Sequence, residues 1–166
     1  MTAALLDRPA VKRVRAALAA AGAAGEVMVL AETARTAADA AAAVGVPQGA
    51  IVKSLVFRAG DTPVLALIAG DRRCDSQALA RVLGLGEGVR RADADFARAG
   101  TGYSIGGVAP LAHSQPIATA IDASLGRFAT VYAAAGHPHC VFPTSLAELV
   151  ALTGGIVTEA IGIAAG

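Results

Sequence analysis

Lys53 is the residue of this chain whose setting most clearly points to chemistry. It lies within Ile51–Phe57, a run of apolar and β-branched residues that predicts a strand. Because side chains alternate along a strand, the lysine shares its face with Ile51, Leu55 and Phe57. An ammonium group among apolar side chains needs an anionic or dipolar partner. Lys53 is therefore a candidate functional residue; the alternative is an edge-strand lysine that reaches water along its own methylenes.

A second candidate segment is rich in glycine and spans Gly102–Pro110. Gly106 and Gly107, followed by Pro110, can let a turn present backbone N–H groups to a ligand, because no Cβ blocks close approach. Such a turn could cradle an oxyanion or a carboxyl group. The alternative is a turn that only connects two elements. The segment is neither a Walker loop nor a dinucleotide fingerprint, so we expect no nucleotide cofactor.

Histidine and cysteine residues gather at Gly136–Cys140. His137 and His139 could face one side of the chain and bind a metal, but no second ligand pair follows at a recognisable spacing, so we expect no metal. A catalytic pair of His139 and Cys140 is disfavoured, because neighbours on an extended chain point to opposite faces. Asp122 ends a predicted strand, where it could orient a ligand or cap the following turn.

Composition limits the classes of partner. With 166 residues, of which 55% are hydrophobic, the chain predicts one domain over residues 1–166. Its 14 basic and 13 acidic side chains give a net charge of +1, so a nucleic acid would have to be gripped locally and a DNA-binding protein is disfavoured. Two distant cysteines and no signal-peptide pattern indicate a cytoplasmic protein with reduced thiols. The longest uncharged stretch, 128–147, contains prolines, so no membrane span is predicted.

Glycine and proline divide the chain into short alternating elements. Helical spacing and capping signals predict helices at residues 9–21, 36–44, 75–83, 93–99 and from 145 to Gly154. Apolar and β-branched runs predict strands at residues 26–30, 51–57, 64–69, near Val89, and at 117–121 and 128–134. A turn at Gly60-Asp61 pairs the second and third of these strands as an antiparallel hairpin. There are more strands than the crossovers of a parallel sheet could connect, which predicts an α/β (α+β) fold with a mixed sheet flanked by helices.

Three ordered motifs resemble the YbaK/EbsC family, which includes the ProX proteins and the editing domain inserted in bacterial prolyl-tRNA synthetases. The motifs are the lysine strand Ile51–Phe57 after an alanine-rich helix, the glycine segment Gly102–Pro110, and Ile121-Asp122. The resemblance covers residues 36–161. It implies a mostly antiparallel mixed sheet surrounded by helices and a trans-acting deacylase, without a cofactor, that hydrolyses the ester of a mischarged aminoacyl-tRNA.

The resemblance also implies roles for individual residues. Lys53 matches the essential lysine of the family, and Ser54 takes the place of the small hydroxyl residue that follows it. In the glycine segment, Gly106, Gly107 and Pro110 match the loop that approaches the aminoacyl carbonyl and the terminal adenosine. Asp122 matches the acidic residue after the next strand. His139 resembles the histidine at the aminoacyl pocket of the synthetase editing domain, which favours alanine or another small amino acid over cysteine alone.

The implied chemistry agrees with the residue types. Ester hydrolysis builds negative charge on the carbonyl oxygen, and a preorganised backbone donor stabilises that charge by roughly a hundredfold in rate. Lys53 is better suited to steady this charge, or a phosphate, than to act as a base. Water or a hydroxyl of the substrate would be the nucleophile. The tRNA contacts, and possible association with a synthetase, would add specificity. The alternative function is a binding module that captures aminoacyl-tRNA or a small ligand without catalysis.

Overall fold

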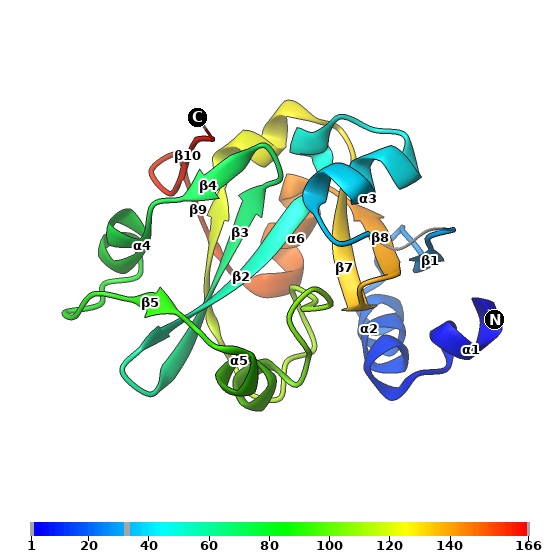
Figure 1. Ribbon diagram of the computed structural model, residues 1–166, viewed down its shortest axis with the longest axis horizontal. Coiled ribbons are helices and arrows are strands. Elements are labelled where there is room, and N and C mark those ends of the chain that lie inside the picture. The colour runs from blue at the N-terminus through cyan, green and yellow to red at the C-terminus, as the bar shows by residue number, and fades with distance from the viewer. Residues whose placement is uncertain (1, 32–33, 166) are drawn as a thin grey trace.

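In a computed structural model, which describes residues 2–31 and 34–165, the chain builds two β-sheets that meet where strand β2 begins (Figure 1). The larger sheet has the order β5-β2-β3-β6-β9, and its strands are β2 (Val52–Ala59), β3 (Thr62–Ala69), β5 (Arg90–Arg91), β6 (Ala118–Asp122) and β9 (Ile156–Thr158). The smaller sheet has the order β1-β8-β7, and its strands are β1 (Met28–Val29), β7 (Val131–His137) and β8 (Cys140–Thr144). A separate ribbon pairs β4 (Arg72–Cys74) with β10 (Gly162–Ala164).

Most strand pairs are antiparallel. The predicted hairpin is confirmed: β2 and β3 run antiparallel across the turn at Gly60-Asp61, with Lys53 opposite Ile68. Both parallel strand pairs among the described strands involve β6, which pairs in parallel with β3 and with β9. The prediction of a mixed, mostly antiparallel sheet with surrounding helices is therefore confirmed.

Helices cover both faces of the larger sheet and the back of the smaller one. They are α1 (Thr2–Leu6), α2 (Pro9–Ala20), α3 (Ala37–Val44), α4 (Ser76–Val82), α5 (Ala94–Thr101) and α6 (Leu146–Thr153), with 3₁₀ turns η1 (Gln48–Ala50) and η2 (Ala123–Arg127). Their ends agree with the predicted caps. Thr36 accepts the N–H of Asp39 at the start of α3, and Ser145 accepts the N–H of Glu148 at the start of α6. Gly45 and Gly154 end these two helices in the left-handed conformation that favours glycine.

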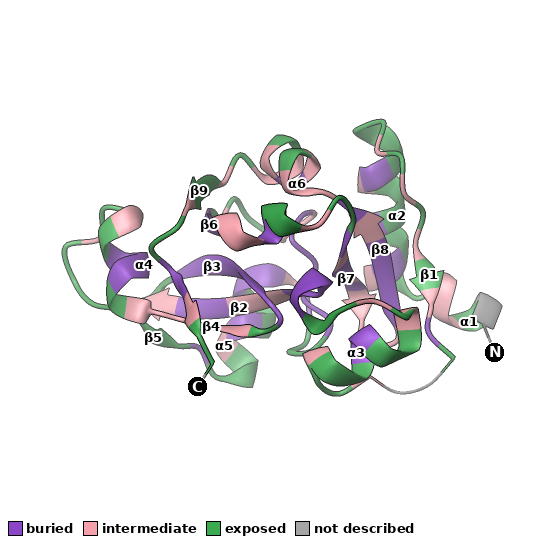
Figure 2. Cartoon of the chain, turned by 90° about the horizontal axis from the view of Figure 1, so that it is seen from above, coloured by how far each residue is buried: buried purple, intermediate pink, exposed green. Residues whose placement is uncertain are grey.

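The core has two main parts, on opposite faces of the larger sheet (Figure 2). On one face, Val52 and Val56 of β2 pack with α2 residues such as Val14 and with the smaller sheet. On the other face, Phe57 and Leu55 pack with Leu79 of α4. The face of β2 that carries Lys53 is therefore the α4 face, which confirms that the lysine lies with Leu55 and Phe57.

Four strands were missing from the sequence prediction. They are β4, β8, β9 and β10, and the strands β4, β9 and β10 are only three residues long. Strand β8 contains Pro143, a residue that cannot donate to a ladder and that usually argues against a strand. Here it pairs opposite Tyr132 at the end of the hairpin. The segment Gly136–Cys140, treated above as a chemical cluster, is in fact the end of β7 and the tight turn into β8.

Within the described ranges, no helix combines the length and the apolar character needed to cross a membrane.

Candidate functional site

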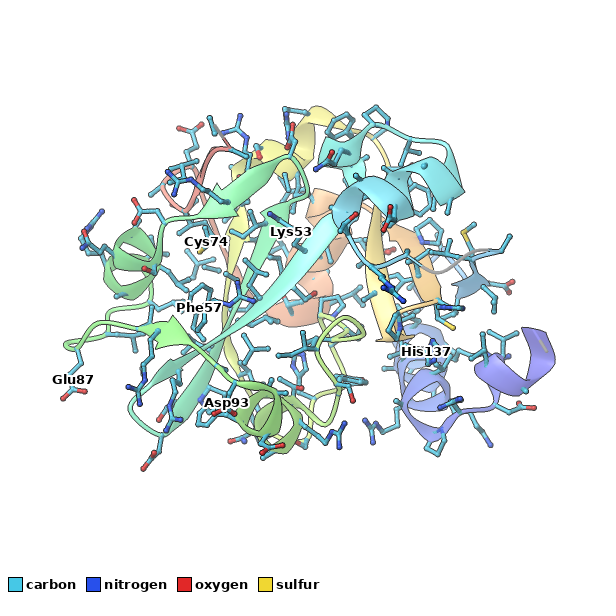
Figure 3. The ribbon with its side chains drawn as sticks, in the orientation of Figure 1. Lys53, Phe57, Cys74, Glu87, Asp93 and His137 are labelled. Atoms are coloured by element: carbon cyan, nitrogen blue, oxygen red, sulfur yellow. The ribbon has the colours of Figure 1, made fainter. Side chains whose placement is uncertain are left out.

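Lys53 projects from the beginning of β2, and Cys74 of β4 lies on the same side of the larger sheet (Figure 3). The lysine side chain is partly buried, and its ammonium donates a hydrogen bond to the backbone carbonyl of Arg72 at the start of β4. The pKa of Lys53 is lowered from its ordinary value, because burial disfavours the charged form and the nearby Arg91 guanidinium repels it. The lysine thus has the dipolar partner that its sequence setting demanded.

The strand is open along one edge at Lys53. Strand β5 pairs with β2 only at Phe57 and Arg58, while β3 accompanies β2 along its whole length. Strand β2 also turns toward the smaller sheet at its start, where Ile51 forms a bridge with Tyr132. Ile51 packs under α3 and not with Leu55, so that part of the predicted face is wrong. The opening beside β2 forms the mouth of a pocket.

This pocket has a volume of about 480 Å³ and brings together three of the predicted site residues, Lys53, Ser54 and Gly106. Two further cationic side chains, Arg35 and Arg91, also line it, and the described lining holds no carboxylate. Much of the remaining wall is small or apolar, with alanines from α3 and the segment before it, and with Val108 and Tyr132. The pocket therefore combines positive charge with an apolar wall, which suits a ligand that has an anionic part and a small apolar part.

Ser54 lies next to the lysine on the opposite face of β2. Its hydroxyl oxygen is buried, and within the described residues it has no hydrogen-bond partner. A buried hydroxyl without a partner is unfavourable, by roughly 1–3 kcal/mol. Because Ser54 lines the pocket, a ligand is the natural source of the missing bond.

The glycine segment forms one wall of the pocket. Gly106 has a φ of 95°, a conformation that favours glycine, and it lines the pocket directly. The N–H of Gly107 donates to the carbonyl of Ser104 at 3.0 Å, so this amide is already engaged within the turn. Below the turn, the hydroxyl of Tyr103 donates to the carbonyl of Ala112 at 2.8 Å. Pro110 is buried and does not belong to the pocket lining.

The two histidines lie together at the β7–β8 turn. The N–H of His139 donates to Nδ1 of His137 at 3.1 Å, and the two rings meet edge to face with their centroids 5.3 Å apart. The pKa of His137 is lowered by partial burial, with smaller contributions from Arg8 and the neighbouring histidine. The residues on either side of His139, Pro138 and Cys140, line the pocket, whereas His139 itself does not.

Asp122 lies apart from the pocket lining. It is buried, with 1% of its surface exposed, and its carboxylate accepts the N–H of Ala69 at 3.1 Å and the N–H of Ser124 at 2.9 Å. The backbone of Gly162 covers the carboxylate so closely that a β-carbon there would collide with it. Asp122 therefore caps η2, the second of the two roles considered from the sequence, and also fixes the end of β3.

Sequence reasoning missed Arg35, Arg91 and Tyr132, which also line the pocket. Arg91 reaches the pocket because β5 pairs Arg91 with Phe57, and its guanidinium lies over the Phe57 ring, 5.5 Å from the ring centroid. A two-residue strand carries no periodic signal, so nothing in the sequence indicated this pairing. Within residues 2–31 and 34–165, no three His, Cys, Asp or Glu side chains cluster as metal ligands would.

Comparison with known proteins agrees with this architecture. The aminoacyl-tRNA editing domain family matches residues 31–152. A solved structure described as a candidate trans-editing enzyme for prolyl-tRNA synthetase has 37% identity and a TM-score of 0.86, covering 94% of this chain and 98% of that one. Hypothetical protein APE2540 has 30% identity and a TM-score of 0.82, covering 91% of this chain and 99% of that one.

A curated relative is the uncharacterized protein YwhH of Bacillus subtilis (strain 168). It is 33% identical over 111 residues, which are 66% of this chain and 69% of YwhH. The family match, residues 31–152, begins and ends slightly earlier than the resemblance given from the sequence motifs, residues 36–161. It contains all three motifs. The chain therefore belongs to the family of aminoacyl-tRNA editing domains.

Proposed function

We propose that this protein hydrolyses, in trans, the ester bond between a small amino acid and a mischarged tRNA. The observation that carries the proposal is the convergence of Lys53, Ser54 and Gly106 on one cationic pocket. Its volume of about 480 Å³ lies within the range of about 300–1,000 Å³ that is typical of small-ligand sites. Such a pocket can hold the aminoacylated end of a tRNA while the rest of the nucleic acid stays outside.

Lys53 is proposed to stabilise the negative charge that develops during hydrolysis. Water attacks the ester carbonyl carbon, the bond to the ribose oxygen breaks, and a proton from the water ends on that oxygen, which leaves the free amino acid and the tRNA hydroxyl. The carbonyl oxygen is anionic in between. A partly buried ammonium held by the Arg72 carbonyl is already oriented, so it needs little reorganisation in the transition state.

The glycine turn is proposed to supply a backbone donor to the same oxygen. Gly106 is the better candidate, because its backbone faces the pocket while the N–H of Gly107 is engaged by Ser104. Gly107 would then act by letting the turn lie against the β7–β8 hairpin, and Pro110 by holding the turn's far end. Asp122 would act through the scaffold, because its carboxylate is already bonded to Ala69 and Ser124.

The cations at the mouth are proposed to contact the backbone of the tRNA acceptor end. Arg35 is exposed and Arg91 is exposed on β5, and both line the pocket beside Lys53. Planar guanidinium groups bind phosphate through two parallel hydrogen bonds. Three local cations can fix the end of one strand even though the whole chain has a net charge of only +1.

Alanine, serine, threonine and cysteine are the proposed amino acids, and tRNA for proline is the first acceptor to test. The alanines of the pocket wall form a lining that suits the side chain of a small amino acid. The Ser54 hydroxyl offers a hydrogen bond to a polar group of the substrate. A pocket separates side chains that differ by one methylene by only about ten- to two-hundredfold. Contacts with the tRNA, or delivery by a synthetase, would supply further specificity.

The test is release of labelled amino acid from alanyl-, seryl-, threonyl- and cysteinyl-tRNA, on proline and non-proline acceptors, with wild type and Lys53→Ala. Lys53-dependent release from one or more of these esters would support the deacylase and identify its substrate. Intact ester across the panel, together with binding of the charged tRNA, would favour the binding module instead. Loss of binding without change in turnover at saturation would also contradict a catalytic lysine.

A further inference from the structure

An ion pair lies beside the hydrogen-bond acceptor of Lys53. Asp71, in the turn between β3 and β4, accepts bonds from Nη2 of Arg127 at 2.8 Å and from Nη1 at 3.0 Å. The same guanidinium donates from Nε to the carbonyl of Ser124 at 2.7 Å. All three nitrogens of Arg127 are thus engaged, and both oxygens of Asp71 are held by one partner. The next residue after Asp71 is Arg72, whose carbonyl accepts the Lys53 ammonium.

From this arrangement we infer that Asp71 and Arg127 are positioning residues for Lys53: the pair fixes the β3–β4 turn and keeps the Asp71 carboxylate from binding the lysine. The catalytic consequence of this inference rests on the proposed deacylase function. The positioning of Lys53 by the pair does not depend on that function, and it can be measured separately.

The rest of the turn is held by other elements. The carbonyl of Gly70 accepts a bond from the side chain of Gln48 at 2.9 Å, and the N–H of Gly70 donates to the carbonyl of Ile51 at 2.7 Å. One residue earlier, the N–H of Ala69 donates to Asp122. Residues 69, 70 and 71 therefore each form hydrogen bonds with a different neighbouring element. Asp71 is the last of them before Arg72, whose carbonyl accepts the Lys53 ammonium.

The ion pair is also seated against the segment that leads into β2. Gly49, in η1, lies so close that a β-carbon on it would be 2.9 Å from Nη2 of Arg127 and 2.9 Å from Oδ2 of Asp71. Only glycine leaves room for the pair at this point. The contact joins η1, the β3–β4 turn and η2 on one side of Lys53.

Charge gives the pair a second effect on the lysine. Four titratable groups act on Lys53: Arg91 lowers its pKa, whereas Cys74, Asp71 and Asp122 raise it. Asp122 is buried and bonded, so Asp71 is the carboxylate that could move toward the ammonium. Arg127 holds both of its oxygens and so leaves the Arg72 carbonyl as the acceptor of the lysine.

The pair is too exposed to matter mainly for stability. The side chains of Arg127 and Asp71 are 37% and 40% exposed, and ion pairs in such settings contribute little to the stability of a fold. If removing the pair slows amino-acid release, the small accompanying loss of stability would therefore not account for the slower rate.

The test uses Arg127→Gln, Asp71→Asn and their combination, with Asp61→Asn as the matched control. Asp61 forms the ion pair with Arg58 at the opposite end of the β2–β3 hairpin, so the same chemical change is made far from Lys53. Two quantities are measured: the single-turnover rate of amino-acid release at saturating protein, and the pKa of Lys53 by NMR of ¹³Cε-labelled lysine. The chain has only two lysines, Lys12 and Lys53, so Lys12→Arg assigns both signals.

We expect Arg127→Gln to slow release about tenfold or more, because small misplacements of a catalytic group have large effects on rate. The pKa of Lys53 should rise in Arg127→Gln, because the freed carboxylate turns toward the ammonium, and fall in Asp71→Asn, because an attractive charge is removed. In the double variant the pKa should lie between these two values, and its release should be faster than that of Arg127→Gln alone. Asp61→Asn should change neither quantity.

A Lys53 pKa that stays at the wild-type value in both single variants would overturn the inference, and so would a slower release without a change at Lys53. If the wild type releases no amino acid from any mischarged tRNA, the proposed function fails. The two NMR shifts would then still decide whether the pair positions the lysine.

Discussion

Gly107 lies directly against the backbone of His137. A β-carbon on Gly107 would be 2.9 Å from both the nitrogen and the Cα of His137, a distance that real β-carbons do not adopt. The glycine segment and the histidine hairpin, which are about thirty residues apart in sequence, are thus locked together beside the pocket. This contact explains why a glycine follows Gly106, whose backbone lines the pocket.

Replacing Gly107 with alanine should therefore displace the glycine turn. The obstacle is backbone and cannot swing away, so we expect Gly107→Ala to reduce deacylation at least tenfold and to lower the melting temperature. Gly88→Ala is the matched control, because nothing lies within 4 Å of a β-carbon at Gly88. Equal melting temperatures and equal rates for the two variants would show that the turn does not depend on this contact.

Lys53 should lower the stability of the fold at neutral pH. Its pKa in the folded protein lies below the ordinary 10.5, mainly because burial disfavours the charged form, so between these two values the unfolded chain binds more protons. Stability contributed by this group therefore rises with pH across that window. Lys53→Met should be at least as stable as the wild type at pH 7 and should lose this rise, whereas the exposed Lys12→Met should keep it. Urea unfolding at several alkaline pH values measures the difference; a drop in stability at pH 7 for Lys53→Met would contradict the sign.

The thiol of Cys74 should react slowly at neutral pH. Burial, followed by the charge of Asp75, raises its pKa from 9.0 to about 11, and only the thiolate is nucleophilic. In Cys140→Ser, which leaves Cys74 as the only cysteine, the rate of alkylation by iodoacetamide should climb with pH until about 11. A rate that levels off below pH 9 would mean that the thiol is better solvated than the fold indicates.

The hydroxyl of Tyr103 should stabilise the segment that follows the glycine turn. Tyr103 is 1% exposed, and its hydroxyl lies 2.8 Å from the carbonyl of Ala112 and 3.1 Å from that of Leu111. We expect Tyr103→Phe to lower the free energy of unfolding by about 1–2 kcal/mol, because one buried and one partly buried carbonyl lose their donor. For Tyr132→Phe we expect a change within about 0.5 kcal/mol, since the described residues offer the Tyr132 hydroxyl no hydrogen bond. Similar losses in both variants would contradict this assignment.

Local signals explain which elements could be predicted from the sequence. The caps at Thr36 and Ser145 and the stops at Gly45 and Gly154 involve residues only three or four positions apart, so both partners of each interaction can be seen in a short stretch of sequence. Only half of the capping box at Ser145 forms. The carboxylate of Glu148 instead accepts the hydroxyl of Thr144 at 2.7 Å, outside the helix.

Contacts that depend on register could not be predicted in the same way. Lys53 was found because a single lysine interrupts an apolar strand, but its acceptor on Arg72 depends on how β4 follows β3. Arg91 enters the pocket through a two-residue strand. Asp71 and Arg127 are 56 residues apart and meet only after β6 has paired with β3. Pairings at such a separation leave no periodic trace in one sequence.

The measurement that tests the proposed function most directly compares wild type with Lys53→Met in one experiment. Binding of mischarged tRNA is measured at equilibrium, and release of its amino acid is followed in a single turnover at saturating protein. We expect the wild type to bind and release, and Lys53→Met to bind within about tenfold of wild type but release at least a hundredfold more slowly. Release by Lys53→Met at the wild-type rate, or an intact ester with the wild type, would contradict the assignment of Lys53 as the catalytic cation.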